Sequence, residues 1–108
     1  MIPSQMLKGT LEGCIMAVIS RQPTYGYEIT QKLADYGFGP IAEGTVYPLL
    51  LRLEKNGLAR AEYRASEVGP RRKYYMLTEK GQAELAAFLT SYRELTDAVG
   101  RLLDEIGE

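Results

Sequence analysis

Apolar residues recur at helical spacing near the start of the chain. Between Gln5 and about Ser20 they fall at Leu7, Leu11, Cys14, Ile15, Val18 and Ile19. These are the i, i+4, i+7, i+8 steps of an α-helix with one buried face. Arg21-Gln22-Pro23 follows, and proline cannot continue a helix. The pattern predicts a first helix that ends before this proline.

A second helix is predicted directly after Pro23. Thr24 is its expected N-cap, because a threonine hydroxyl can accept a hydrogen bond from a free N–H of the first turn. Ile29 and Leu33 are spaced to face inward, and Tyr36-Gly37 closes the element. A turn-rich connection over residues 37–40 then leads into the next element.

A third helix is predicted from about Gly44 to Asn56. Its expected buried stripe consists of Val46, Leu49, Leu50 and Leu53. Asn56-Gly57 is typical of a left-handed helix stop. Pro48 fits this helix if it lies in the first turn, where its missing N–H would have no partner to lose.

The apolar period then changes from helical to strand-like. Leu58 to Tyr63 and Arg71 to Leu77 are short runs separated by a Gly-Pro loop, which predicts two antiparallel strands joined as a hairpin. Thr78 is the expected cap of a last helix, with Glu79 in its first turn.

The last helix has the most regular pattern of the chain. Its apolar residues are separated alternately by three and four positions: Leu85, Phe88, Tyr92, Leu95, Val99, Leu102 and Ile106. A sustained period of 3.5 is the seam of a coiled coil, and the natural partner is the same helix of a second copy. The alternative is that the helix packs back on the first helix of its own chain.

These elements predict a mainly α fold with a two-stranded β wing, namely a winged helix-turn-helix followed by a long C-terminal helix. Residues 1–78 would form a DNA-binding domain and residues 79–108 a dimerisation helix. The chain has 108 residues, which is the length of one domain.

Composition excludes several functions. With no histidine and a single cysteine, Cys14, the chain lacks the usual nucleophile–base pairs, transition-metal ligands and disulfides, so we expect no enzyme and no cofactor. No apolar run is long enough to span a membrane, and no signal peptide is recognisable. A cytoplasmic location is expected.

The net charge of −1 hides a strongly uneven distribution. Residues 1–51 carry three cations and four acids, residues 52–78 carry seven cations and three acids, and residues 79–108 carry three cations and seven acids. The middle stretch is therefore +4. Because a polyanion responds to the local field, the overall negative charge does not exclude double-stranded DNA as a partner.

The third helix is the expected recognition helix, whose N-terminal part enters the major groove. Its outward face would offer Thr45, Tyr47, Pro48, Leu51, Arg52 and Lys55. Thr45 can reach a base edge or a phosphate and Tyr47 a phosphate, whereas Arg52 and Lys55 are better placed for the backbone. The alternative is that Tyr47 is partly buried and Arg52 pairs with a nearby carboxylate.

The hairpin carries a second cationic group. Arg71, Arg72 and Lys73 follow the Gly-Pro loop, and Arg64 lies on the opposite strand. A protruding hairpin with these cations can contact a phosphate backbone or a minor groove. The alternative is a solubility patch on an exposed strand edge.

Several blocks of sequence, in this order along the chain, resemble the PadR family of bacterial transcriptional regulators, in its short subtype with one C-terminal helix. They are LKGTLE at 7–12, YGYEI at 25–29, EGTVYPLL at 43–50, RLEKNGL at 52–58, GPRRKYY at 69–75 and LTEKG at 77–81. The resemblance implies a homodimeric repressor that a small, often aromatic, effector releases from its operator.

The chain departs from the family pattern at three positions. Tyr25 stands where histidine is usual, so an expected donor to the DNA backbone becomes a phenol. Ala42 replaces a hydroxyl cap before the third helix, and Leu51 replaces a polar residue. Each departure affects the operator sequence that we would expect.

The resemblance also implies an effector site near the dimer interface. Phe88 and Tyr92 are the candidate aromatic walls, and Met6 and Ile15, together with Met1, could add apolar contacts. The alternative is that Phe88 and Tyr92 serve only the helix seam.

The main rival to DNA binding is a winged-helix module that docks a protein partner. Such a module has no need of Arg71, Arg72 and Lys73 beside Arg64, which favours DNA. Double-stranded RNA is disfavoured because its narrow major groove does not admit a helix. A dimer would read pseudo-palindromic half-sites about one 10-bp turn or a multiple apart. The operator, the regulated genes, the effector and the sign of regulation are not determined by the sequence.

Overall fold

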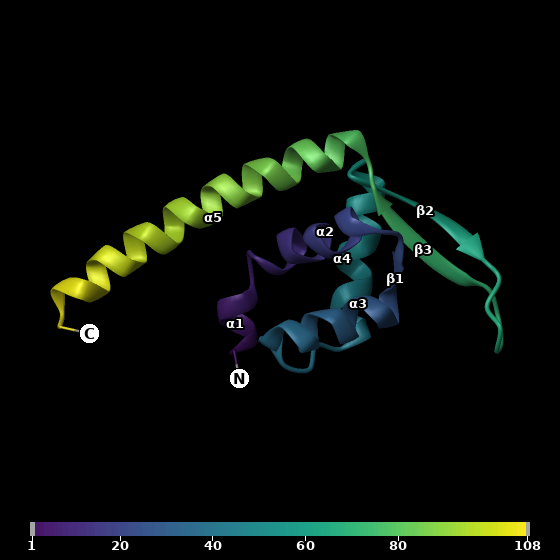
Figure 1. Cartoon of the computed structure of the whole chain (residues 1–108), viewed down its shortest axis with the longest axis horizontal. Coiled ribbons are helices and arrows are strands. Elements are labelled where there is room, and N and C mark those ends of the chain that lie inside the picture. The colour runs from purple at the N-terminus through teal and green to yellow at the C-terminus, as the bar shows by residue number, and fades with distance from the viewer. Residues whose placement is uncertain (1, 108) are drawn as a thin grey trace.

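The computed structural model describes residues 2–107. Its elements are, in chain order, α1 (Ser4–Leu7), α2 (Leu11–Arg21), β1 (Thr24–Tyr25), α3 (Gly26–Leu33), the π-helical turn η1 (Ala34–Phe38), α4 (Glu43–Lys55), β2 (Ala59–Arg64), β3 (Arg72–Leu77) and α5 (Glu79–Glu105). Helices α1 to α4 form a compact body, α5 runs away from it, and the β2–β3 ribbon projects on the opposite side (Figure 1). The predicted winged helix-turn-helix with a long C-terminal helix is confirmed.

The predicted continuous first helix is wrong. The chain forms α1 and α2, separated by Lys8, Gly9 and Thr10. Gly9 has a φ of +98°, a left-handed conformation that interrupts a helix and that side chains disfavour. The Thr10 hydroxyl donates to the carbonyl of Leu7 at 2.9 Å and closes the turn. The apolar spacing continued across this break, and it therefore gave no signal of it.

The predicted cap role of Thr24 is also wrong. Thr24 and Tyr25 form the short strand β1, which pairs antiparallel with β3 in the register Thr24↔Tyr75 and Tyr25↔Tyr74. The Thr24 hydroxyl donates to the Gln22 carbonyl at 2.8 Å, and α3 begins only at Gly26. The predicted hairpin thus belongs to a three-stranded sheet with the order β1-β3-β2.

The core lies between α2, α3, α4 and the sheet. Val46, Leu50 and Leu53 of α4 are each at most 1% exposed, while Leu49 packs against the core from a half-buried position. Tyr75 is the β3 residue that enters this core, at 1% exposure. Because these residues fix one face of α4 inward, the opposite face is presented outward.

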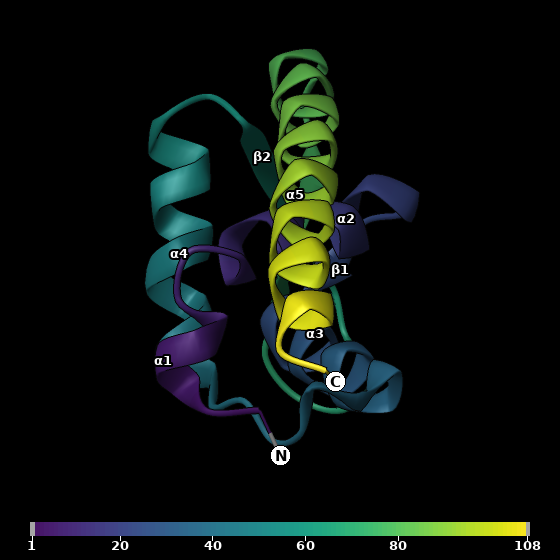
Figure 2. The ribbon, with the colours of Figure 1, turned by 90° about the vertical axis from the view of Figure 1, so that its left-hand side faces the viewer.

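Helix α5 is anchored to the body by its first turns. The Thr78 hydroxyl accepts from the Gly81 N–H at 3.0 Å, which confirms its predicted cap role. A Cβ at Gly81 would lie 2.0 Å from the Leu58 carbonyl oxygen, so only glycine allows this approach. The ring of Phe88 likewise packs closely on Gly13 of α2, where a Cβ would lie 2.5 Å from the ring atoms. Farther along, α5 projects from the body, as the view from its C-terminal end also shows (Figure 2).

Candidate nucleic-acid interface

The outward face of α4 is built by the residues that its buried stripe excludes. Thr45, Pro48, Arg52 and Lys55 are exposed, and Tyr47 and Leu51 are 50% and 41% exposed. Tyr47 is therefore available at the surface rather than buried. Leu51 lies at the surface beside these polar residues. The structure thus brings the predicted recognition residues onto one accessible helix.

The two cations of α4 differ in their surroundings. The Arg52 Nε donates to Glu12 Oε2 at 2.8 Å, so Arg52 joins α4 to the first turn of α2. This is the carboxylate pairing considered as the alternative for Arg52. Lys55 forms no ion pair with any residue from 2 to 107. Its charge remains free to meet a polyanion.

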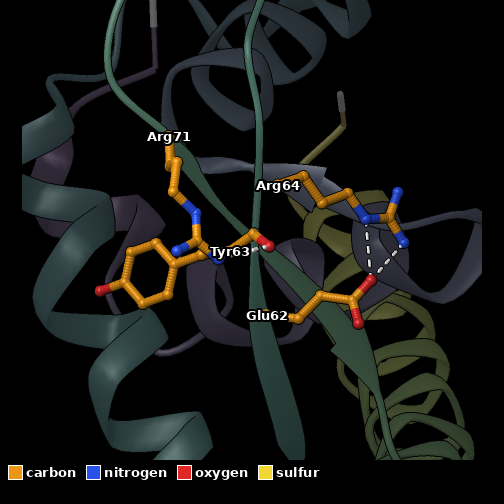
Figure 3. A network of polar contacts seen from close by, with 4 residues as sticks. All are labelled: Glu62, Tyr63, Arg64 and Arg71. Atoms are coloured by element: carbon orange, nitrogen blue, oxygen red, sulfur yellow. Dashed lines mark hydrogen bonds and ion pairs between the residues drawn. The ribbon is translucent and has the colours of Figure 1, made fainter.

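The three arginines nearest the loop of the wing, Arg64, Arg71 and Arg72, each lie over a tyrosine ring. Arg71 lies 5.7 Å above the Tyr63 ring, which is on the strand opposite (Figure 3). Its Nη2 also donates to the Tyr63 carbonyl at 3.4 Å. An exposed cation–π contact of this kind contributes roughly 0.5–1 kcal/mol, and it leaves the guanidinium edge available for hydrogen bonds. Stacking therefore orients Arg71 without neutralising it.

Arg72 and Arg64 occupy the other face of the ribbon. Arg72 lies 4.4 Å above the Tyr25 ring and Arg64 lies 4.9 Å above the Tyr74 ring. The two arginines are directly opposed across β2 and β3, an arrangement of like charges that costs free energy. Glu62 relieves it, because its Oε1 accepts from Arg64 Nε at 2.8 Å (Figure 3). Arg72 has no such acidic partner among the described residues.

Lys73 is the wing cation that faces the body. Its Nζ lies 3.0 Å from Oε1 of Glu54 on α4 and 5.2 Å from the centroid of the Tyr75 ring, and the side chain is only 20% exposed. Although burial opposes its charge, the Glu54 carboxylate and the adjacent Tyr75 phenol raise the pKa of Lys73. This pair links the wing to the recognition helix, and Glu54 already compensates the lysine charge.

Sequence reasoning missed the partners that set these geometries. Tyr63 and Tyr74 support arginines, while Glu54 and Glu62 each hold one cation of the wing. The alternation of aromatic and cationic residues along both strands was a usable signal for the stacks. The Glu54–Lys73 pair had no such signal, because it joins two elements whose relative placement only the fold provides.

Tyr25 is drawn into the same surface by β1. Its ring meets Tyr74 edge-on, with centroids 5.3 Å apart, and supports Arg72. Tyr25, Gly26 and Tyr27 also line a hollow at the start of α3, and its other walls come from α4 and β3. The predicted Tyr25 thus lies beside the wing cations and near the first turn of α4.

The predicted seam of α5 divides into two parts. Leu85 is 9% exposed and Phe88 is half-buried against the body, so these two residues follow the alternative of packing on their own domain. Five later seam residues are 44–69% exposed, namely Tyr92, Leu95, Val99, Leu102 and Ile106. Leu89 and Leu103 add to this apolar surface. The outer part of α5 is therefore a long apolar face that no other residue from 2 to 107 covers.

The residues suggested for an effector are in unequal positions. Phe88 and Tyr92 are stacked, with centroids 6.0 Å apart and an interplanar angle of 26°. Met6 is 72% exposed, whereas Ile15 is fully buried and would be reached only by opening the core. Met1 lies outside the described residues. The stacked aromatic pair is the part of this group that a ligand can approach.

Across residues 2–107, no helix combines the length and the apolar character needed to cross a membrane. Within the same range, no three His, Cys, Asp or Glu side chains are grouped to hold a metal ion.

Comparison with known proteins gives a consistent result. The profile of the "Transcriptional regulator PadR-like family" matches residues 15–87. A PadR-like transcriptional regulator of Bacillus cereus is 47% identical, with a TM-score of 0.82 over 92% of this chain and 96% of that one. The transcriptional regulator Rv3488 of Mycobacterium tuberculosis is 36% identical over 75 residues, which are 69% of this chain and 68% of that protein.

A more distant structure shares the fold. It is that of Bacillus subtilis PadR in complex with operator DNA, which is 24% identical to this chain. The match has a TM-score of 0.68 and covers 74% of this chain and 47% of that one.

Proposed function

Because the chain belongs to the PadR-like family of transcriptional regulators, we propose that it binds a pseudo-palindromic operator as a homodimer in the cytoplasm. In this proposal it represses transcription and a small-molecule effector releases it. Residues 1–78 form the DNA-binding part and residues 79–108 supply the dimerisation helix. Its assignment as a transcriptional regulator, and not as an enzyme, follows from the family itself.

One observation carries the DNA-binding part of the proposal. Arg71 and Arg72 are held on tyrosine rings, at the end of the ribbon, without an acidic partner among residues 2–107. Arginines in this state have lost part of their conformational freedom but none of their charge. They are suited to binding a phosphate backbone. A surface that docks a protein would not require such oriented, unpaired arginines.

The recognition helix supplies the second contact surface. With α4 in the major groove, Thr45 and Tyr47 near its N-terminus face base edges or phosphates, as in other helix-turn-helix proteins. Pro48 adds apolar contact in the same turn, and Lys55 reaches the backbone at the far end. Arg52, Arg64 and Lys73 contribute less to DNA binding, because each is already paired with a carboxylate of the chain.

The exposed face of α5 supports the homodimer. A row of large apolar side chains along a solvent-facing helix is unusual for a monomer, and its 3.5-residue period suits a second copy of the same helix. Leu102→Glu would place a charge in this row. We expect the variant to sediment as a monomer and to bind the operator far more weakly, whereas Arg101→Glu beside it should remain dimeric.

The stacked Phe88 and Tyr92 support the effector part of the proposal. They lie where α5 leaves the body, so a flat aromatic ligand inserted there would change the direction of α5. In a dimer joined through α5, that change alters the distance between the two recognition helices. Release from the operator would follow, because half-site spacing is fixed by the DNA helix.

Fluorescence anisotropy tests the proposal. The duplex comes from upstream of the protein's own gene, or from in vitro selection, and a shuffled duplex of equal composition is the control. We expect tight binding to the native duplex only, falling steeply with salt. Equal weak binding to both duplexes, or none at any salt, would instead favour a winged-helix module that docks a protein.

A further inference from the structure

A hollow lies where the first turns of α3 and α4 meet strand β3. It is lined by Tyr25 of β1, by Gly26 and Tyr27 of α3, by Glu43 and Tyr47 of α4, and by Arg72, Lys73 and Tyr75 of β3. It therefore separates the recognition helix from the wing. Both of these elements meet DNA in the proposed function, on which this inference rests.

The inner wall of the hollow is Tyr75. This residue is 1% exposed, and its hydroxyl has no hydrogen-bond partner among the described residues. Buried hydroxyls are almost always satisfied, so one that is not calls for an explanation outside the chain. Burial raises the pKa of this phenol, and the nearby Lys73 ammonium opposes that shift. Tyr75 thus lines the hollow and carries a hydroxyl donor without a partner among the described residues.

Two helix N-termini contribute to the same place. The N-cap residues are Tyr25 for α3, which begins at Gly26, and Ala42 for α4, which begins at Glu43. Neither residue caps its helix with a side-chain hydrogen bond. Helix N-termini carry partial positive charge and N–H groups that lack intrahelical acceptors. Gly26 also leaves its wall without a side chain, which lets an anion approach the backbone.

The charged side chains around the hollow define the anion. Arg72 and Lys73 are positive, Glu54 compensates Lys73, and Glu43 on the first turn of α4 is negative. These four charges sum to zero, so the positive ends of α3 and α4 remain, which favours a ligand with a single negative charge over a dianion. A phosphodiester carries one charge, whereas a phosphate monoester carries nearly two at pH 7.

We propose that this hollow is the seat of one phosphodiester of the DNA backbone, with the Arg72 guanidinium at its rim and the Tyr75 hydroxyl as its innermost donor. The phosphate fixes the wing and the recognition helix to the same point of the DNA.

Tyr75→Phe removes the hydroxyl and keeps the ring in the core. We expect the variant to keep or raise the free energy of unfolding, because the lost hydroxyl has no partner in the free protein. Binding to the operator duplex should weaken about tenfold, as expected for a lost hydrogen bond to a charged group. Tyr36→Phe, on exposed η1, is the matched control and should change neither quantity.

The outcomes separate the two proposals. If wild-type protein binds its operator and Tyr75→Phe binds equally well, the phosphate seat is wrong and the proposed function stands. If the variant loses stability as well as affinity, the hydroxyl is structural and the seat is again wrong. If wild-type protein binds no duplex specifically, the proposed function fails and the seat fails with it.

A second measurement locates the phosphate. Each backbone phosphate of the duplex is replaced in turn by a neutral methylphosphonate. At one position per half-site, the replacement should weaken operator binding by wild-type protein. The same replacement should weaken binding by the Tyr75→Phe variant much less, because both changes remove the same contact. Losses that add at every position overturn the proposal. Thermal denaturation with inorganic phosphate, at constant ionic strength, gives a further check. If phosphate raises the Tm of wild-type protein but not of the Tyr75→Phe variant, the hollow serves a free ligand and the proposal is wrong.

Discussion

Neighbouring cations of the wing carry the same kind of charge in different states. Arg71 and Arg72 rest on tyrosine rings and keep their full charge. Lys73, the next residue along β3, is only 20% exposed and is paired with Glu54 of the recognition helix at 3.0 Å. The two arginines are thus placed to meet an external polyanion, whereas the lysine holds the wing against α4. A count of positive residues would not distinguish them.

The largest expected effect comes from removing the charges of these two arginines. Arg71→Ala combined with Arg72→Ala should weaken operator binding roughly 100-fold at moderate salt, since each loss of a charge-assisted phosphate contact costs about 1.5 kcal/mol or more. The free energy of unfolding should change little, because both side chains are at the surface. Anisotropy titration and chemical denaturation measure the two quantities. Arg93→Ala with Arg101→Ala, on exposed α5, is the control.

Removing the Lys73 charge should produce the opposite profile. Lys73→Met leaves the Glu54 carboxylate unpaired beside the core, and we expect it to lower the free energy of unfolding by about 1 kcal/mol. The matched variant Lys55→Met, from an unpaired surface lysine, should leave stability unchanged. Urea denaturation of both variants decides this. Equal stability of the two proteins would mean that the Glu54 pair does not hold the wing.

The stacks provide a smaller test of the arginines. Tyr63→Leu keeps the size of an apolar side chain but removes the ring beneath Arg71, and we expect operator affinity to fall about threefold, in line with a cation–π contact of about 0.5–1 kcal/mol. Surface plasmon resonance should show the change mainly as a faster dissociation rate. An unchanged affinity would show that the ring does not orient Arg71 for DNA.

The smallest effect is on alkaline stability. The Glu54 carboxylate and the Tyr75 phenol raise the pKa of Lys73 in the folded state, so the folded protein holds this proton more tightly than the unfolded chain. The stabilisation is complete below the unfolded lysine pKa of about 10.4 and is lost as pH rises above it. The stability difference between wild-type protein and Lys73→Met should therefore shrink above about pH 10.5. A constant difference from pH 7 to 11.5 would contradict this.

Much of the fold was predictable because its signals are local. The stripe of α4, the Asn56-Gly57 stop and the Thr78 cap each depend on a few neighbouring residues. The break at Gly9 was missed because the apolar spacing runs across it. Strand β1 was missed because two residues are too short to show a period, and the pairing of Thr24 with Tyr75 is a tertiary contact.

The candidate site was predictable only in part for a related reason. Sequence position alone placed Arg64, Arg71 and Arg72 on a hairpin, and the structure adds which rings they rest on. The sequence did not indicate that Lys73 turns toward α4, because its partner Glu54 lies nineteen positions away on another element. Whether a cation is free or paired depends on the packing between elements, and no periodic pattern along the chain records that.

The most direct test of the account compares salt dependence on one duplex. The logarithm of the operator binding constant is measured against the logarithm of salt concentration for wild-type protein, Arg72→Ala and Lys73→Ala. We predict that Arg72→Ala lowers the slope by about one, the value for one lost phosphate contact, and that Lys73→Ala leaves it close to that of wild-type protein. Equal reductions for both variants would contradict the division of the wing cations into arginines that face DNA and a lysine that holds the wing to α4.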